Sequence, residues 1–492
     1  MTSSRSSWRR LAAPAVVLLT LLVVYGPALR GAFVWDDIDF IVETSWYRAD
    51  DGLRQIWLEP STTSQYYPLT YSSHWIEQRL FGSDTLGYHV VNVVLHAANA
   101  LLLWLVLRAL EVPGALLAAA IFALHPVHAE SVAWISERKN VLSGFFFLSA
   151  VLAWLRASPP TQDRMVHRGW YGACLAFFVM ALLAKTVACS LPAVILLLVW
   201  WKRGRVDRGI VAWLAPLFVI GVAFAALTVW LEVHTVGAKG DEFTLQPLDR
   251  IAIAGRAVWF YAGKLAWPER LVFIYPRWPS AGSAPWQLLF AGALLVVVAA
   301  LWRARDAIGR GPLTAVLLFA GILVPALGFF DVYPMRYSFV ADHFQYLAST
   351  VAIAFGAAIA TVGARRLGTS WRRPATALAV AVCVLLGVLT WRRSHVFANP
   401  ENLWRDTVAG NPTAWMAMNN LAYELRRQGR SQEAVPLVRR AIELNPDCLE
   451  CYGNLADAHR DLGDEVSRKA VFGQVTAHLL RQLARKNAAA AR

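Results

Sequence analysis

The sequence is poor in charged residues and in cysteine. Only 16% of its 492 residues are charged, whereas 57% are hydrophobic and the mean hydropathy is +0.43. This composition exceeds what a soluble core of this length uses, and it predicts a polytopic membrane protein. Three of the five cysteines lie in apolar runs. With only Cys448 and Cys451 left, no disulfide framework or metal-binding quartet is predicted, and packing is their expected role.

Acidic residues are also scarce, with 33 against 47 basic residues and a net charge of +14. The arginines stand in short clusters between apolar runs, as in membrane topology signals rather than nucleic-acid-binding faces. We therefore expect a lipid bilayer and no nucleic acid among the partners. Eleven apolar runs are predicted to span the membrane, at about 11–29, 90–110, 113–124, 141–156, 170–184, 187–201, 210–231, 286–302, 313–329, 347–363 and 375–391.

No small-residue cleavage site follows the first apolar run before Trp35, so this run is expected to remain as a span with a cytoplasmic N-terminus. The segment 251–267 is ambiguous because it carries Arg256 and Lys264. If it lies in the interface or is re-entrant, four basic clusters face the cytoplasm, as the positive-inside rule favours. The membrane domain, 1–391, then has outer loops at 30–88, 125–140, 232–284 and 330–346.

The sequence after Trp391 is polar and periodic. Asn411-Pro412 recurs as Asn445-Pro446, which is the 34-residue period of the tetratricopeptide (TPR) repeat. The sequence therefore predicts a TPR domain of about two repeats at 392–485, outside the cytoplasm, with a disordered tail at 486–492. It could form a groove for a protein or peptide, or it could be a capping domain.

Three acids, Asp36, Asp37 and Asp39, follow the first span. Asp37 and Asp39 share one side of an extended chain and could hold a metal ion. The acids could instead be solvated loop charges. Partial burial beside aromatic residues at a membrane exit would raise the proton affinity of a carboxylate towards that of a general base.

A reaction on a lipid phosphate would also need cations at the same level, to bind the phosphate and stabilise it as a leaving group. Arg336 and His343 in the fourth outer loop are candidates. Arg138 and Lys139 are candidates in the second loop, with membrane anchoring as the alternative. Lys185 is expected to be an interfacial turn residue, although it too could meet a phosphate.

The second loop also carries His125, His128 and Glu130. Their spacing matches no established zinc motif, so structural hydrogen bonding is the favoured role for the histidines. All three residues are expected to support the candidate site from the second loop.

Several motifs together resemble the transmembrane and TPR-containing O-mannosyltransferases, and especially their bacterial members. The matching stretches are Phe33-Val34-Trp35-Asp36-Asp37, Tyr67-Pro68-Leu69-Thr70, Tyr88-His89-Val90-Val91-Asn92 with His96, Phe122 to Trp134 with Glu137-Arg138-Lys139, and Val340-Ala341-Asp342. With the repeat tail they span nearly the whole chain, and the second-loop motif is the most specific.

The resemblance implies an all-α polytopic bundle of the GT-C glycosyltransferase type, in the inner membrane of a bacterium. It also implies a polyprenyl-phosphate sugar donor, with mannose as the expected sugar, and a protein acceptor held through Ser or Thr by the TPR tail. The family's acidic pair falls on Asp36 and Asp37, and Asp39 is not carried over. Bacterial relatives usually have Arg where this chain has His343, which could bind phosphate only when protonated.

Two other functions stay open at this point. The chain could be a non-catalytic TPR scaffold for envelope proteins, in which the acids only shape a loop. A transporter would instead be expected to place ionisable residues in mid-span and to show paired half-repeats, and the sequence shows neither.

The eleven-span topology makes a prediction about the segment after the last span. A reporter fused after Trp391 should lie outside the cytoplasm, because an odd number of spans separates it from the N-terminus. Paired alkaline phosphatase and green fluorescent protein fusions measure this. A cytoplasmic signal would refute the topology.

Overall fold

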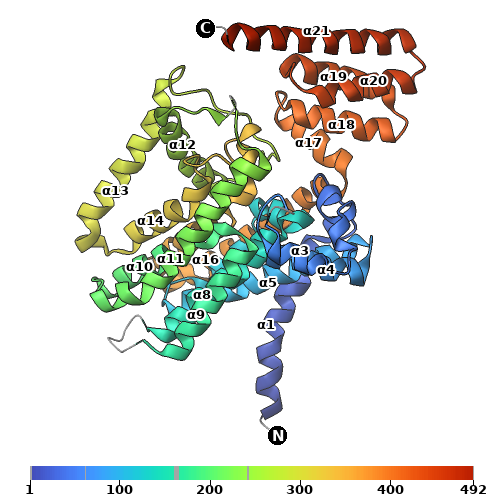
Figure 1. The fold of residues 1–492 in the computed structure, drawn as a ribbon. Coiled ribbons are helices and arrows are strands. Elements are labelled where there is room, and N and C mark those ends of the chain that lie inside the picture. The colour runs from blue at the N-terminus through green and yellow to red at the C-terminus, as the bar shows by residue number, and fades with distance from the viewer. Residues whose placement is uncertain (1–2, 61–62, 160–165, 241–242, 491–492) are drawn as a thin grey trace. The chain divides into compact units, whose positions relative to one another are not determined.

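The protein is represented by a computed structural model that describes residues 3–60, 63–159, 166–240 and 243–490, with side chains described between residues 14 and 481 of those ranges. Every regular element in these ranges is a helix (Figure 1). The chain forms two compact units. The membrane unit comprises Met1–Leu271 and Trp278–Ala398, and the tail unit comprises Val272–Arg277 and Asn399–Arg492.

The helices of the membrane unit are α1 (Ser3–Val24), α2 (Gly26–Leu29), α3 (Gly52–Leu58), α4 (Pro68–Phe81), α5 (Thr85–Ala109), α6 (Ala115–Leu124), α7 (Ala129–Ala133), α8 (Arg138–Ala157), α9 (Arg168–Ala184), α10 (Leu191–Arg203), α11 (Arg208–Leu231), α12 (Pro247–Ala266), α13 (Leu288–Ile308), α14 (Gly311–Leu323), α15 (Tyr346–Arg366) and α16 (Arg372–Ser394). Short 3₁₀ turns complete the outer loops: η3 (Pro126–His128), η4 (Ile135–Glu137), η5 (Thr186–Ser190), η10 (Tyr333–Arg336) and η11 (Asp342–Gln345).

Seven helices in the described ranges are long and apolar enough to cross a membrane, or eight if the bent pair Ala115–Leu124 and Pro126–Ala133 forms one span. The other three predicted spans fall on shorter apolar helices, at Pro14–Val24, Arg168–Ala184 and Gly311–Ala326. The expectation of an all-α polytopic bundle is therefore confirmed. The same criteria do not select α12 as a span.

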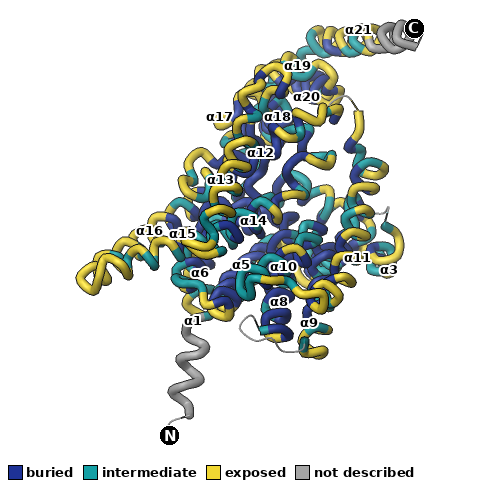
Figure 2. Tube along the Cα trace, turned by 90° about the vertical axis from the view of Figure 1, so that its left-hand side faces the viewer, coloured by how far each residue is buried: buried dark blue, intermediate teal, exposed yellow. Residues whose placement is uncertain are grey.

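The composition of each helix decides its surroundings. Helices α13 and α16 expose most of their apolar side chains, which suits contact with lipid (Figure 2). In contrast, α12 buries one face and exposes Leu248 and Trp259 on the other. Its start is fixed by Pro247 in the first turn and by Asp249, which accepts a hydrogen bond from the Gln246 N–H at 3.2 Å.

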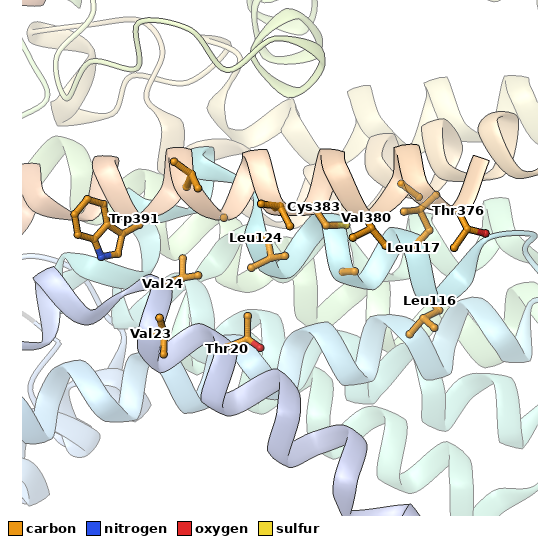
Figure 3. Close-up of a pocket in the computed structure, with 15 residues that line it drawn as sticks. Thr20, Val23, Val24, Leu116, Leu117, Leu124, Thr376, Val380, Cys383 and Trp391 are labelled. Carbon is orange, nitrogen blue, oxygen red and sulfur yellow. The ribbon is translucent and has the colours of Figure 1, made fainter. Parts of the chain in front are cut away.

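Helices α1, α6 and α16 enclose an apolar groove of about 580 Å³ (Figure 3). Val24, Leu117 and Val380 contribute to its wall from the three helices. At one end, the Thr390 hydroxyl donates to the Leu124 carbonyl at 2.7 Å and so joins α16 to α6. No charged residue lines this groove among the residues described.

The tail unit contains α17 (Pro400–Gly410), α18 (Trp415–Arg427), α19 (Ser431–Leu444), α20 (Leu449–Asp461) and α21 (Glu465–Ala490). The pairs α18–α19 and α20–α21 turn at Gly429 (φ +77°) and Gly463 (φ +70°), which are one repeat period apart. Glycine enters this left-handed region without a Cβ clash. Helix α21 continues to Ala490, which corrects the expectation of disorder at 486–490, and residues 491–492 lie outside the described residues.

An extended segment of the third outer loop belongs to the tail unit. Residues 272–275 are buried, the Phe273 ring lies 5.8 Å from the Trp404 ring of α17, and the Asn411 amide donates to the Ile274 carbonyl at 3.1 Å. Helix α17 has no first helix of its own repeat to pack against. The loop segment therefore covers the apolar face that a preceding helix would cover in a longer array.

Cys448 and Cys451 form a disulfide at the start of α20, with their Cα atoms 5.3 Å apart. The structure thus corrects the expectation that these residues only pack. Sequence spacing could not show the pairing, because C-x-x-C is also common in metal and redox motifs.

The loop segment predicts how the tail is stabilised. Phe273→Ala should destabilise α17 and the adjoining repeat by about 3–5 kcal/mol, because it empties the space beside Trp404. Pulse proteolysis of the full chain, with cleavage followed in the tail, measures the loss. Leu449→Ala is the matched control, since Leu449 is 52% exposed. Equal protection of the Phe273 variant and the wild type would show that the segment does not hold the tail.

Candidate active site

The first outer loop is fixed by the carboxylate of Asp37. One oxygen accepts hydrogen bonds from the N–H and hydroxyl of Ser136, at 2.8 and 2.5 Å, and the other accepts from the Val34 N–H at 3.0 Å. Asp37 is fully buried, and the preceding Trp35 adopts φ +51°. Since a bulky residue rarely adopts a positive φ, this turn depends on the contacts around it. Asp37 therefore joins the first loop to the second.

Asp36 points to a different environment. Its Oδ1 accepts one hydrogen bond from the Trp134 indole N–H at 3.1 Å, and the rings of Trp35 and Trp134 stack at 5.3 Å beside it. Burial raises the pKa of the Asp36 carboxyl to about 8, while the nearby Lys139 opposes the rise. The pKa of Asp37 rises less, to about 6, because burial is countered by the Ser136 and Val34 hydrogen bonds.

Glu137 is the centre of a charged cluster next to Asp36. Its carboxylate lies 2.9 Å from the Lys139 ammonium and 3.2 Å from that of Lys185, and it accepts a hydrogen bond from the Asn140 amide. Glu137 is buried, whereas the lysine side chains remain 17% and 15% exposed. The buried carboxylate therefore holds the two ammonium groups in place, while the lysine side chains stay partly exposed.

His343 completes this cluster from the fourth loop. Its Nδ1 lies 2.6 Å from Glu130 and its Nε2 lies 3.9 Å from Glu137. The Asn140 amide also donates to the His343 carbonyl at 3.1 Å. The second and fourth loops therefore meet where the sequence placed candidate residues in both.

Arg336 lies in η10 of the fourth loop. Its guanidinium donates to the Tyr333 hydroxyl at 3.4 Å and lies 5.8 Å from the centre of the Tyr337 ring. This loop is tied to two others by the buried Glu232, which accepts from the Tyr333 N–H at 3.0 Å and from the Gln65 amide at 2.7 Å.

Arg138 occupies a structural position instead of the phosphate site expected from the sequence. Its side chain is fully buried and pairs with Glu77 at 2.6 Å. It also donates to the Asn92 side chain and to the Tyr88 carbonyl. With its donors engaged by α4 and α5, Arg138 is a packing group of the bundle.

His125 and His128 are likewise engaged within the protein. The His125 ring donates to the Leu265 carbonyl at 3.0 Å, and the His128 ring donates to the Phe122 carbonyl at 2.8 Å and lies 2.8 Å from the Ser349 hydroxyl. These contacts agree with the structural role that the sequence favoured.

The metal hypothesis for Asp37 and Asp39 does not fit the donor set. Three protein donors already occupy the oxygens of Asp37, and the Asp39 side chain is exposed. Within the described ranges no three His, Cys, Asp or Glu side chains gather as metal ligands would.

Glu137 and Lys185 are the site residues that sequence reasoning underrated. The signal for Lys185 was a lone cation between two apolar runs, which is costly at bilayer depth unless the charge is paired. The signal for Glu137 was its position next to Arg138 and Lys139 in the second-loop motif. The sequence does not show which of Glu137, Arg138 and Lys139 faces inward, because the η4 turn determines the direction of each side chain.

The chain as a whole is similar to several known proteins. A tetratricopeptide repeat family model matches residues 416–445. Protein O-mannosyl-transferase TMTC4 of Mus musculus is 25% identical over 87% of this chain and 66% of its own length. TMTC1 of Homo sapiens is 25% identical over 89% of this chain and 56% of its own. A protein O-mannosyl-transferase of Caenorhabditis elegans is 34% identical over 28% of this chain and 22% of its own.

The chain thus spans less than two thirds of the length of these relatives. Among solved structures, ArnT from Cupriavidus metallidurans bound to undecaprenyl phosphate is 16% identical, with 94% of this chain and 79% of that chain covered. Its TM-score of 0.40 is too low to establish a shared fold. The sequence comparisons confirm the resemblance read from the motifs: the chain is a homologue of protein O-mannosyl-transferases, and its own C-terminal part matches a tetratricopeptide repeat.

Proposed function

We propose that this protein is a membrane glycosyltransferase of the GT-C type that moves a sugar, mannose by the resemblance, from a polyprenyl-phosphate donor to a hydroxyl group. Ser and Thr side chains of proteins held by the TPR tail are the proposed acceptors. The observation that carries the proposal is the pairing of Asp36, a carboxyl with a raised pKa, with the Lys139–Lys185 pair on Glu137. A base and a cationic site are what transfer from a phosphate requires.

Asp36 is the proposed base, and Asp37 positions it. Asp37 has both oxygens engaged by backbone and Ser136 donors, so a further proton would displace contacts that hold the loop. Asp36 is only partly covered, and the Trp134 indole N–H donates to its Oδ1. A pKa near the working pH also suits a base that must take a proton and release it again.

The reaction follows from these placements. Asp36 takes the proton of the acceptor hydroxyl, and the oxygen of that hydroxyl forms a bond to the sugar C1. The bond between C1 and the phosphate oxygen breaks, and its electron pair leaves with the polyprenyl phosphate. Lys139 and Lys185 offset the charge that develops on this phosphate, with His343 and Arg336 as further contacts. Attack opposite the leaving group inverts C1.

Two observations support an extracytoplasmic tail. The segment 272–277 joins the tail unit, so the third outer loop and the C-terminal domain lie on one side of the membrane. The Cys448–Cys451 disulfide suits an oxidising compartment. With a cytoplasmic N-terminus, as proposed from the basic clusters, this side is the periplasm in a bacterial inner membrane.

The assignment of the base predicts a large and selective loss. Asp36→Asn should lower turnover by roughly 10²–10⁴-fold while the chain still folds, because the amide cannot take the proton. Purified variants are assayed with polyprenyl-phosphate mannose and an acceptor peptide, and transfer is followed by mass spectrometry. Asp39→Asn is the control and should stay fully active, since this side chain is exposed. A folded Asp36→Asn variant with full transfer would refute the mechanism.

Asp36 and Lys185 together predict how the rate of transfer depends on pH. Transfer should rise as Asp36 ionises near pH 8 and fall as Lys185 loses its proton, since burial also lowers the pKa of Lys185 to about 8. The rate against pH should therefore be bell-shaped. Lys185→Arg should move only the alkaline limb upward, because guanidinium stays charged, and Lys185→Gln should raise the donor KM.

Arg138→Gln separates this phosphate site from the structural charges. The free energy of unfolding of this variant should fall by about 3–5 kcal/mol, because the substitution leaves Glu77 buried without its partner. If Lys185→Gln instead unfolds the chain and Arg138→Gln changes only the donor KM, the two roles have been assigned the wrong way round.

A further inference from the structure

A long cavity runs through the membrane unit, apart from the candidate active site. Its volume is about 830 Å³, and its wall is formed by α5, α8, α10, the end of α13, α14 and α15. Along α15 it extends from Thr350 to Arg366, which at the rise of an α-helix is about 24 Å. This is a large part of the roughly 30 Å hydrocarbon core of a bilayer.

The two ends of the cavity differ in charge. Arg366, the one charged residue that lines it in the described ranges, stands at the end where α15 stops. Arg366 is exposed and has no ion-pair partner in the part of the chain that the structure describes. At the same end, Trp201, Ile308 and Gly311 line the wall. Residues close in sequence to the lining residues at this end include three basic ones, Lys202, Arg305 and Arg310, and two acidic ones, Glu111 and Asp306.

The opposite end is apolar and closed. Beyond it, the Asn99 amide donates to the Tyr346 hydroxyl at 2.9 Å, and both residues are buried. The Thr350 hydroxyl, which lines this end, donates its proton to the Leu347 carbonyl at 2.6 Å and so has no proton left to donate to an anionic ligand. A molecule that fills the cavity must therefore carry its charge at the Arg366 end and its hydrocarbon chain towards Thr350.

We propose that this cavity binds one anionic phospholipid from the leaflet at the Arg366 end, with an acyl chain in the cavity and the phosphodiester headgroup at Arg366. The chemistry matches at both ends, because a basic mouth attracts an anionic headgroup and the apolar wall accepts the chain. The sugar donor does not fit this polarity, since its phosphate is needed at the Lys139–Lys185 level. The groove of Figure 3 has no such charge and serves as an internal comparison.

Native mass spectrometry of the full chain, released from vesicles of equal phosphatidylglycerol and phosphatidylcholine, tests the proposal. The wild type should retain phosphatidylglycerol in preference. Arg366→Gln should reduce that preference by roughly fivefold, whereas its neighbour Arg365→Gln, which does not line the cavity, should change it much less. Because Arg366 is exposed at a helix end, its variant is expected to fold.

A second pair of variants tests the chain-binding part. Ala354→Phe fills the cavity and should remove the retained lipid, whereas Ala360→Phe, on the exposed face of the same helix, should keep it. Equal retention of both lipids by the wild type, or retention that survives both Arg366→Gln and Ala354→Phe, overturns the proposal. Displacement of phosphatidylglycerol by added polyprenyl phosphate also overturns the proposal, because it would show that the cavity binds the sugar donor.

Discussion

A charge that leaves water must find a partner, and the loops around Glu137 in the membrane unit are organised by that constraint. Glu137 is buried and balances two lysines from different elements, Lys139 of α8 and Lys185 at the end of α9. Removal of Glu137 would leave both ammonium groups without their carboxylate, whereas removal of one lysine leaves Glu137 paired with the other. The pairing therefore joins α8 to the turn after α9, and it holds both ammonium groups on one carboxylate, where we propose that the donor phosphate binds.

The same constraint separates structural charges from available ones. Glu77 and Arg138 pair deep between helices with their hydrogen bonds filled, so they contribute to the bundle and nothing else. Lys139 and Lys185 keep part of their surface exposed. The adjacent residues 137, 138 and 139 look alike in sequence, and the turn at η4 directs them to different partners.

Helical spans, the repeat tail and the participation of three outer loops could be predicted because they rest on local signals: apolar length, a 34-residue period and basic clusters. The partners of Asp37, Glu137 and Arg138 could not, because each partner comes from a loop or helix distant in sequence. Likewise, nothing in the segment 272–277 shows that it covers α17. Such contacts depend on how separate helices pack, and hydropathy does not record that.

Asp36 and Asp37 show how one pair of neighbouring residues can divide two tasks. Asp37 lies at the start of a helical turn (φ −55°, ψ −36°), and the two neighbouring side chains meet different partners, so the loop uses Asp37 as an anchor while Asp36 contacts Trp134. Asp37 meets Ser136 and Val34, and these contacts hold the backbone through the positive φ of Trp35. Asp36 is thereby set beside Trp134, whose indole N–H donates to it. Burial raises the pKa of Asp36, and the anchored neighbour keeps its carboxyl in place despite that cost.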